Sequence, residues 1–173
     1  MTEPEAAVAI VHAREPEEAV LLMRRTVRQD DPWSGHWSFP GGRRDPHDLD
    51  LLQTALRELE EECGVRLLRE DLETALPPRI ARRADPPYLL VAPFVLRADR
   101  HLPTILDTVE AAEAMWVPLS LLRDPARHAL RSVPGRPPQE QFPAIDLNGT
   151  PLWGFTYRLL MDWLKAPIAG AER

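Results

Sequence analysis

The stretch TALRELEEECGV, residues 54–65, places four glutamates within five positions, at 58, 60, 61 and 62. Like charges one turn apart on a helix repel each other, by roughly a few tenths of a kcal/mol per pair. A helix turns by about 100° per residue, so Glu58 and Glu62 lie about 40° apart, with Glu61 about 60° to the other side of Glu58. Three carboxylates therefore share one face, whereas Glu60 points away and is expected to be solvated.

The residues around this stretch predict where the helix begins and ends. Asp50 is a candidate N-cap, and Gln53 takes the position of its capping-box partner. Gly64 takes the position at which a residue in the left-handed conformation closes a helix. The side of the helix that would face the core carries an apolar stripe formed by Leu52, Leu56, Leu59 and Cys63.

Carboxylates grouped in this way are typical of a site for a hard divalent cation. Mg²⁺ and Mn²⁺ prefer oxygen ligands, and a bound cation would turn the mutual repulsion into attraction. Arg57 lies four residues before Glu61, so it can pair with that carboxylate and orient it. The Gly-Gly turn before the helix, at Gly41 and Gly42, could present a backbone carbonyl. The alternative is a merely solvated helix face, which is the usual explanation of a run of charges.

Length and composition are those of one soluble globular domain. The chain has 173 residues, 44% of them hydrophobic and 28% charged, and a net charge of −6, which argues against a broad nucleic-acid or anionic-membrane surface. Residues 1–10 lack the pattern of a signal peptide, and the apolar run at 88–96 is too short to cross a membrane. The single cysteine excludes an intrachain disulfide. We therefore expect a cytoplasmic protein in which residues 1–173 form one domain.

The remaining pattern predicts a mixture of strands and helices. Two apolar runs at 6–13 and 18–26, joined by a short polar segment, predict a β-hairpin. Residues 37–42 predict a short strand that stops at its proline and glycines. We expect a long buried strand at 87–98 and an amphipathic helix at 152–166. Because strands and helices do not alternate regularly, an α+β fold with a mixed sheet is favoured.

The segment from Gly41 to Val65 resembles the Nudix box. That pattern is Gly, five residues, Glu, seven residues, then Arg-Glu-U-x-Glu-Glu-x-Gly-U, where U is apolar. The second half matches without exception from Arg57 to Val65. In the first half, Asp48 takes the place of the glutamate, and eight residues instead of seven separate it from Arg57.

This resemblance implies a Nudix fold, an α/β/α sandwich around a mixed sheet, and Mg²⁺- or Mn²⁺-dependent hydrolysis of a nucleoside diphosphate linked to another group. By motif position, Glu58, Glu61 and Glu62 would be the metal ligands, and the Gly41 carbonyl would complete the site. The chemistry agrees, because a diphosphate is densely anionic and metals must neutralise it, activate a water and stabilise the leaving oxygen. Glu61, with Arg57 beside it, is one candidate for the glutamate that holds or deprotonates the water.

Many members of the family use a further glutamate from a later loop. Residues 107–119, DTVEAAEAMWVPL, supply Glu110 and Glu113, of which Glu110 is our first choice. Each could instead be an exposed loop acid without a function.

Upstream of the box, LLMRRT at 21–26 and GHWSFPGG at 35–42 resemble the signature of the coenzyme A pyrophosphatase branch. The loop between them departs from the signature, since it is one residue longer and carries two aspartates at 30 and 31. Trp33 and Trp37 flank this loop and could stack a nucleobase or could be packing residues. Coenzyme A carries a 3′-phosphate that needs a basic partner. The candidates for contact with the substrate are Arg25, Trp37, Phe39 and Arg44, with Arg24, Arg28 and Arg43 as further choices for the phosphate.

The leading hypothesis is a pyrophosphohydrolase of coenzyme A or acyl-coenzyme A. The alternatives are a Nudix hydrolase of ADP-ribose, a dinucleotide or a nucleoside triphosphate, and a non-catalytic Nudix-shaped binding module. The partner would be a small nucleotide-type molecule, not a nucleic acid or a membrane. Nudix relatives are often homodimers, so the resemblance leaves a homodimer open.

Overall fold

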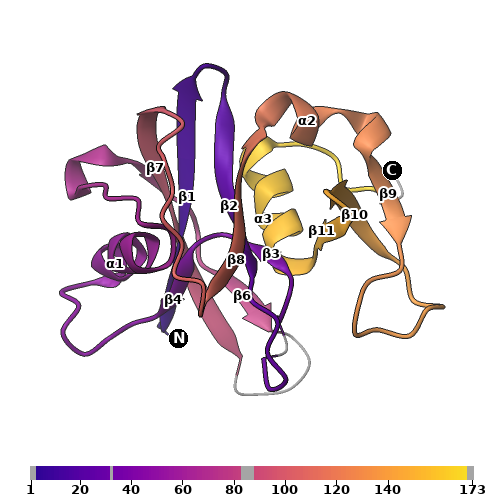
Figure 1. Cartoon of the computed structure of the whole chain (residues 1–173), viewed down its shortest axis with the longest axis horizontal. Coiled ribbons are helices and arrows are strands. Elements are labelled where there is room, and N and C mark those ends of the chain that lie inside the picture. Colours follow the sequence, from indigo (N-terminus) through magenta and orange to yellow (C-terminus); the bar gives the residue numbers. More distant parts are fainter. Residues whose placement is uncertain (1–2, 32, 83–87, 171–173) are drawn as a thin grey trace.

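A mixed β-sheet forms the centre of the computed structural model, which describes residues 3–31, 33–82 and 88–170 (Figure 1). Strand β1 (Ala6–Glu15) runs antiparallel to β2 (Ala19–Arg25) and parallel to β7 (Leu89–Arg100). The order β3-β2-β1-β7-β5 is extended by β4 on β1, β6 on β7 and β8 on β2. The parallel pair makes the sheet mixed, so the α+β fold predicted from the sequence is confirmed. The remaining elements are β3 (Trp37–Ser38), β4 (Gly41–Arg43), α1 (Leu51–Cys63), β5 (Leu72–Ala75), β6 (Arg79–Arg82), β8 (Ala111–Pro118), α2 (Leu119–Arg123), β9 (His128–Arg131), β10 (Phe142–Leu147), β11 (Thr150–Trp153) and α3 (Gly154–Leu164), with 3₁₀ turns at Arg69–Asp71 and Pro125–Arg127.

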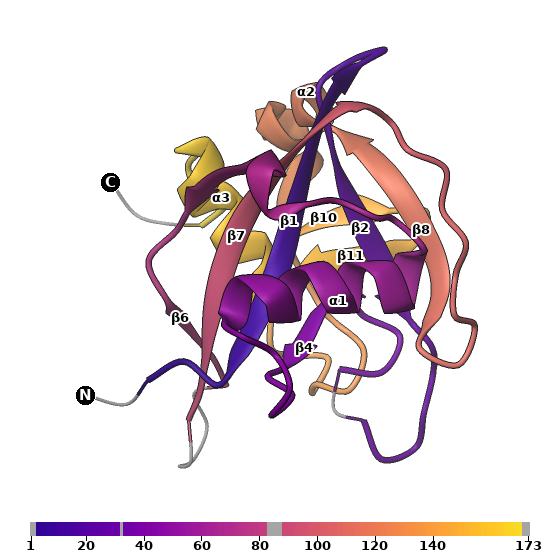
Figure 2. The same cartoon turned by 90° about the vertical axis from the view of Figure 1, so that its left-hand side faces the viewer.

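Both faces of the central strands are buried, which explains their nearly continuous apolar sequence. In β1, Ile10 packs on one face while its neighbours Ala9 and Val11 pack on the other. Helix α1 covers the second face, lying across the strands in Figure 2. Helix α3 and the small sheet β9–β10–β11 cover the first face (Figure 1). The predicted layering of helices on both sides of a sheet is therefore present.

The predicted hairpin of β1 and β2 is confirmed, with His12 opposite Val20 and Ala13 opposite Ala19. The prediction of one strand at 37–42 is wrong in detail, because this segment divides between β3 and β4. The glycines do not end a strand but form β4, in which Gly41 pairs with Val8 of β1. A Cβ atom at Gly41 would overlap the backbone of β1, so this close approach requires glycine.

The C-terminal helix begins later than the sequence predicted. Residues Thr150–Trp153 form β11, which pairs with β10, and α3 starts at Gly154. The turn between the two strands is Asn148-Gly149, with φ angles of 52° and 80°. An Asn-Gly pair between apolar runs is a strong hairpin signal, and it identifies this hairpin in the sequence.

No helix in the described ranges is long and apolar enough to cross a membrane.

Candidate metal and active site

The acidic helix α1 begins and ends as its sequence predicts. The Asp50 side chain accepts a hydrogen bond from the Gln53 amide at 2.9 Å, so Asp50 is the N-cap. The Gln53 side chain accepts from the amide of Leu49 at 2.8 Å, one residue before the position that a capping box uses. Gly64 adopts a φ of 66° and donates to the Glu60 carbonyl at 2.9 Å. The ligand turn therefore lies in the last, well-terminated part of the helix.

Glu62 is a buried carboxylate attached to the sheet. Its residue is only 4% exposed, and its Oε1 accepts a hydrogen bond from the Gly41 amide at 2.8 Å. Burial raises the pKa of Glu62 to about 8, although the Gly41 hydrogen bond acts in the opposite direction. Burial therefore disfavours the charged form of this carboxyl group, and a bound cation would favour it.

Glu58 lies against strand β4, with its carboxylate next to Gly42. A Cβ atom at Gly42 would overlap the Glu58 carboxylate. Burial raises the pKa of Glu58, and the neighbouring Arg57 opposes that shift. The third carboxylate, Glu61, is more open, with a side chain that is 58% exposed. The three predicted ligands thus range from buried to accessible along one face of α1.

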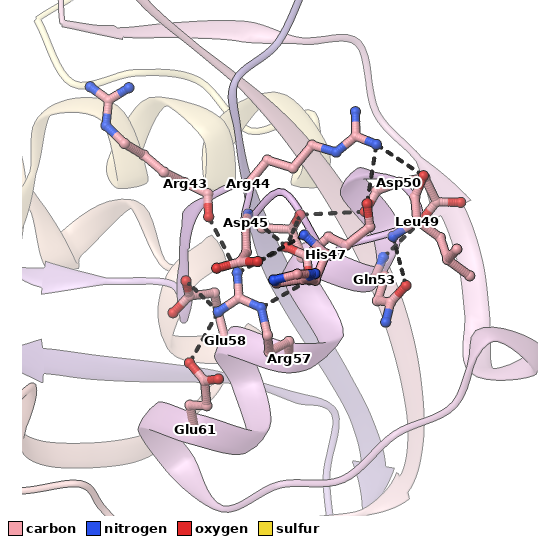
Figure 3. A network of polar contacts seen from close by, with 12 residues as sticks. Arg43, Arg44, Asp45, His47, Leu49, Asp50, Gln53, Arg57, Glu58 and Glu61 are labelled. Atoms are coloured by element: carbon pink, nitrogen blue, oxygen red, sulfur yellow. Dashed lines mark hydrogen bonds and ion pairs between the residues drawn. The ribbon is translucent and has the colours of Figure 1, made fainter.

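Arg57 connects the acidic helix to the loop that precedes it (Figure 3). Its Nη1 donates to Glu58 Oε1 at 3.0 Å and to Glu61 Oε2 at 3.1 Å. Its Nε and Nη2 donate to the two carboxylate oxygens of Asp48, at 3.0 and 2.9 Å, and Nη2 also reaches the Arg43 carbonyl at 3.3 Å. The predicted pairing of Arg57 with Glu61 is present, and Arg57 orients Glu58 as well.

Asp48 takes the place of the first glutamate of the box, and the sequence left its role open. Its side chain is 3% exposed and also accepts from the Asp45 amide at 2.9 Å and the Thr54 hydroxyl at 2.8 Å. The hydrogen bonds from Arg57 hold the pKa of Asp48 well below its usual value. Asp48 therefore fixes Arg57 in place, and its position five residues after Gly42 is the sequence signal that points to this role.

The carboxylates are grouped but do not form a finished coordination shell. In the part of the chain that the structure describes, no three Asp, Glu, His or Cys side chains stand ready to hold a metal ion. Arg57 donates hydrogen bonds to oxygens of Glu58 and Glu61, and the Gly41 amide donates one to Glu62. The donor set nevertheless fits Mg²⁺ or Mn²⁺, because it consists of carboxylate oxygens. Burial raises the pKa of Glu58 and Glu62, and a bound cation would favour their charged forms.

Of the two downstream glutamates, the structure brings Glu110 to this cluster. The Glu110 charge is close enough to contribute to the raised pKa values of Glu58 and Glu62. Glu113 lies within β8 and is bonded to Arg24 and Asn148, each at 3.2 Å. The choice of Glu110 over Glu113 stays a prediction, which this placement favours.

The four residues predicted to contact substrate fall into two pairs. Arg25 pairs with Asp31 at 2.9 Å, and Arg44 donates to the carbonyls of residues 48 and 49 at 3.2 and 3.0 Å. Trp37 and Phe39 are 2% and 3% exposed and belong to the core shared with α3. The Trp37 indole donates to the Leu147 carbonyl at 3.3 Å. This burial corrects the prediction that Trp37 and Phe39 contact the substrate, because no ring face is left to stack on it.

The arrangement of a glycine strand, an acidic helix and an arginine between its ligands can be compared with known proteins. A model of the NUDIX domain matches residues 3–135. This chain belongs to the Nudix family. The family match covers the sheet, the acidic helix and the turn that carries Glu110.

Relatives with curated names match a shorter part of this Nudix chain. Mouse mitochondrial coenzyme A diphosphatase NUDT8 is 42% identical over 60 residues, which is 35% of this chain and 29% of that protein. The uncharacterized Nudix hydrolase NudL of Yersinia enterocolitica is 45% identical over 62 residues, 35% of this chain and 30% of that protein. The aligned stretch thus spans less than a third of either relative.

Solved structures share the fold over a larger part of the chain. A MutT/nudix family protein from Enterococcus faecalis is 18% identical with a TM-score of 0.59, covering 93% of this chain and 61% of that one. The NUDIX domain of Shewanella oneidensis NrtR, solved with ADP ribose, is 21% identical with a TM-score of 0.54, covering 69% and 75%. These likenesses establish the Nudix fold.

Proposed function

We propose that this Nudix chain hydrolyses the diphosphate bond between a nucleoside and another group, with a divalent cation bound at α1. The observation that carries the proposal is the set of Glu58, Glu61 and Glu62, complete and partly buried, held beside the glycine strand β4. A solvated helix face would not bury Glu62 to 4% exposure or place it on a backbone amide of the sheet.

Each residue of the site has a role that follows from its position. Glu58, Glu61 and Glu62 would hold Mg²⁺ or Mn²⁺ together with the Gly41 carbonyl. When bound, the cation would neutralise the diphosphate, activate a water and stabilise the leaving oxygen. Arg57 orients two of the carboxylates. The accessible Glu61, or Glu110 at the edge of the cluster, takes the proton from the attacking water.

Variants of the acidic helix test this function. Glu61→Gln and Glu62→Gln should each lower kcat by about 10²–10⁴-fold while the protein stays folded. Glu60→Gln is the matched control, since Glu60 lies on the same turn but is exposed and turned away from the cluster. The proposal fails if Glu61→Gln and Glu62→Gln both hydrolyse the substrate as fast as the wild type.

Coenzyme A or an acyl-coenzyme A is our first choice of substrate. The support is the upstream signature around Arg25 and the partial likeness to a protein named a coenzyme A diphosphatase. Arg25 and Arg44 stay the proposed phosphate contacts. A panel of coenzyme A, ADP-ribose, a dinucleoside polyphosphate and nucleoside triphosphates with Mg²⁺ tests the choice. Coenzyme A should yield 4′-phosphopantetheine, and cleavage of ADP-ribose but not of coenzyme A would reject it.

The alternative of a binding module without catalysis is less well supported, because such a module would be expected to have lost ligand carboxylates. We propose further that residues 1–173 act as one domain, since β10, β11 and α3 complete a core with β1 and β2. A reducing compartment such as the cytoplasm fits the single, buried, free thiol of Cys63. Assembly as a homodimer stays a family-based option that sedimentation would test.

A further inference from the structure

In the loop that departs from the coenzyme A signature, between residues 26 and 35, Asp31 accepts several hydrogen bonds. The Asp31 carboxylate accepts from Arg25 Nη2 at 2.9 Å and from the Trp33 amide at 3.0 Å. The Asp31 carbonyl accepts from the amide of Ser34 at 3.0 Å, and the Ser34 hydroxyl accepts from the amide of Arg28. The bond from its amide to Ser34 therefore ties the backbone of Arg28 to these residues.

The turn that carries Glu110 is fixed to the end of the acidic helix. The Asp107 amide donates to the Glu62 carbonyl at 3.1 Å, and the Ile105 amide donates to the Cys63 carbonyl at 2.9 Å. Within the turn, the Asp107 carbonyl accepts from the Glu110 amide at 3.0 Å. The backbone of Glu110 is thus placed relative to the ligand turn, but these contacts leave its side chain free to rotate.

Thr26, directly before the loop, and Arg28, within it, connect the loop to this turn. The Thr26 amide donates to the Glu110 carbonyl at 3.0 Å, and its hydroxyl donates to the Thr108 carbonyl at 3.0 Å. Arg28 Nη2 donates to the Val109 carbonyl and to Glu110 Oε1, the latter at 3.3 Å. Between residues 3 and 170, leaving out the gaps in the described ranges, Arg28 is the one side chain bonded to the Glu110 carboxylate.

We infer that Arg28 is a positioning residue that holds the Glu110 carboxylate in one orientation near the acidic cluster. This inference rests on the proposed function, in which Glu110 serves the attacking water. The Nη2 atom is anchored on the Val109 carbonyl, so it offers Glu110 a fixed donor and restricts the rotamers of that side chain. Orientation of a catalytic group is worth large factors in rate, because a misplacement of about 1 Å can cost about 10²-fold.

The same contact contributes little to the stability of the fold. The side chains of Arg28 and Glu110 are 42% and 39% exposed, and ion pairs this open are weak in water. Variants at position 28 should therefore fold normally. Arg79→Gln is a matched control, since Arg79 forms a similarly exposed pair with Asp162 on α3, away from the site.

A double-mutant cycle tests the inference by activity. Arg28→Gln should lower kcat by about 10- to 100-fold and leave KM within about twofold. Glu110→Gln should lower kcat by about 10²–10⁴-fold, and the double variant should be no slower than Glu110→Gln alone. Multiplying losses in the double variant would show that Arg28 acts independently of Glu110, and a loss confined to KM would show that it serves substrate binding; either result would overturn the inference.

A second measurement needs no substrate. In Arg28→Gln, amide exchange of residues 105–110 should accelerate by roughly two- to fivefold, the factor that corresponds to an exposed ion pair. Exchange in Arg79→Gln should match the wild type in this segment. The inference requires that Arg28 be anchored on the Val109 carbonyl of this turn, so unchanged exchange in Arg28→Gln would overturn it. Full activity of Glu110→Gln would overturn it too, while the proposed function would still be judged by Glu61→Gln and Glu62→Gln.

Discussion

Replacing Asp48 by Asn tests whether the arginine of the acidic helix depends on a buried carboxylate. Asp48 is 3% exposed at its side chain and receives both Nε and Nη2 of Arg57, at 3.0 and 2.9 Å. Asn keeps the shape but removes the charge and turns an NH₂ group toward these donors. Removing one partner of a buried pair costs about 3–5 kcal/mol. Arg57 is 27% exposed and keeps Glu58 and Glu61, so we expect about 2–3 kcal/mol.

Urea and thermal unfolding measure this loss. For a protein of this size each kcal/mol lowers Tm by about 2–4 °C, so Asp48→Asn should unfold about 4–12 °C below the wild type. Asp124→Asn is the matched control, because Asp124 pairs with Arg127 at 4.0 Å and is 47% exposed, and Asn also serves as an N-cap. Its free energy of unfolding should change by less than about 0.5 kcal/mol. A loss equally small in Asp48→Asn would refute the reasoning.

The pKa of Asp48 fixes the pH range of this effect. A carboxyl group whose pKa is lower in the folded protein stabilises the fold above its unfolded value, near 4, and loses that contribution as the pH falls. The difference in stability between wild type and Asp48→Asn should therefore be complete at pH 7 and smaller at about pH 3. A difference that is the same at both pH values would show that shape, and not charge, is responsible.

Three further predictions concern the same helix. Mg²⁺ should raise the Tm of the wild type, because it would bind the folded protein and reduce the repulsion among the carboxylates. Glu62→Gln should abolish most of this rise in scanning fluorimetry, and an equal rise in both proteins would contradict the proposed metal site. Burial raises the pKa of Cys63 to about 12, so mass spectrometry should find no alkylation of the native protein by iodoacetamide at pH 8, but rapid alkylation in urea. Gly64→Ala should lower the free energy of unfolding by more than the about 1–2 kcal/mol of left-handed backbone strain, because φ is 66° and a Cβ would also strike the backbone of Ile105. Gly149→Ala, at φ 80° with open space around it, should lose only the backbone strain, and equal losses in urea unfolding would reject the steric argument.

The features that depend on neighbours in the sequence could be predicted well. The caps of α1 at Asp50 and Gly64 were predictable because capping joins residues three or four positions apart. The β1–β2 hairpin follows in the same way from two apolar runs and a short polar link. The strand β4 was missed as a strand because its glycines have no strand preference, and its pairing with β1 is a contact between distant segments.

The residues of the site that belong to the motif could be predicted from the sequence. The surroundings of the other candidates depend on tertiary packing and could not. Trp37 flanks the loop before the box and Phe39 belongs to the signature at 35–42, which suggested contact with the substrate. Their surroundings come from β10, β11 and α3, and the Trp37 partner at Leu147 lies 110 positions away. Glu110 and Glu113 look alike in sequence, but the start of β8 at residue 111 leaves Glu110 in the turn beside α1. Metal binding itself stays a prediction.

One face of the central sheet is covered by residues that lie beyond the family match. The NUDIX match ends at residue 135, yet Ile145, Leu152 and Leu160 lie beyond it and pack on Ile10 and its neighbours as fully as the residues inside it. A chain cut at the family boundary would uncover this apolar surface and aggregate, although every proposed metal ligand would still be present. The end of the family-model match is therefore not the end of the apolar core, and any shortened version should retain α3 to Leu164.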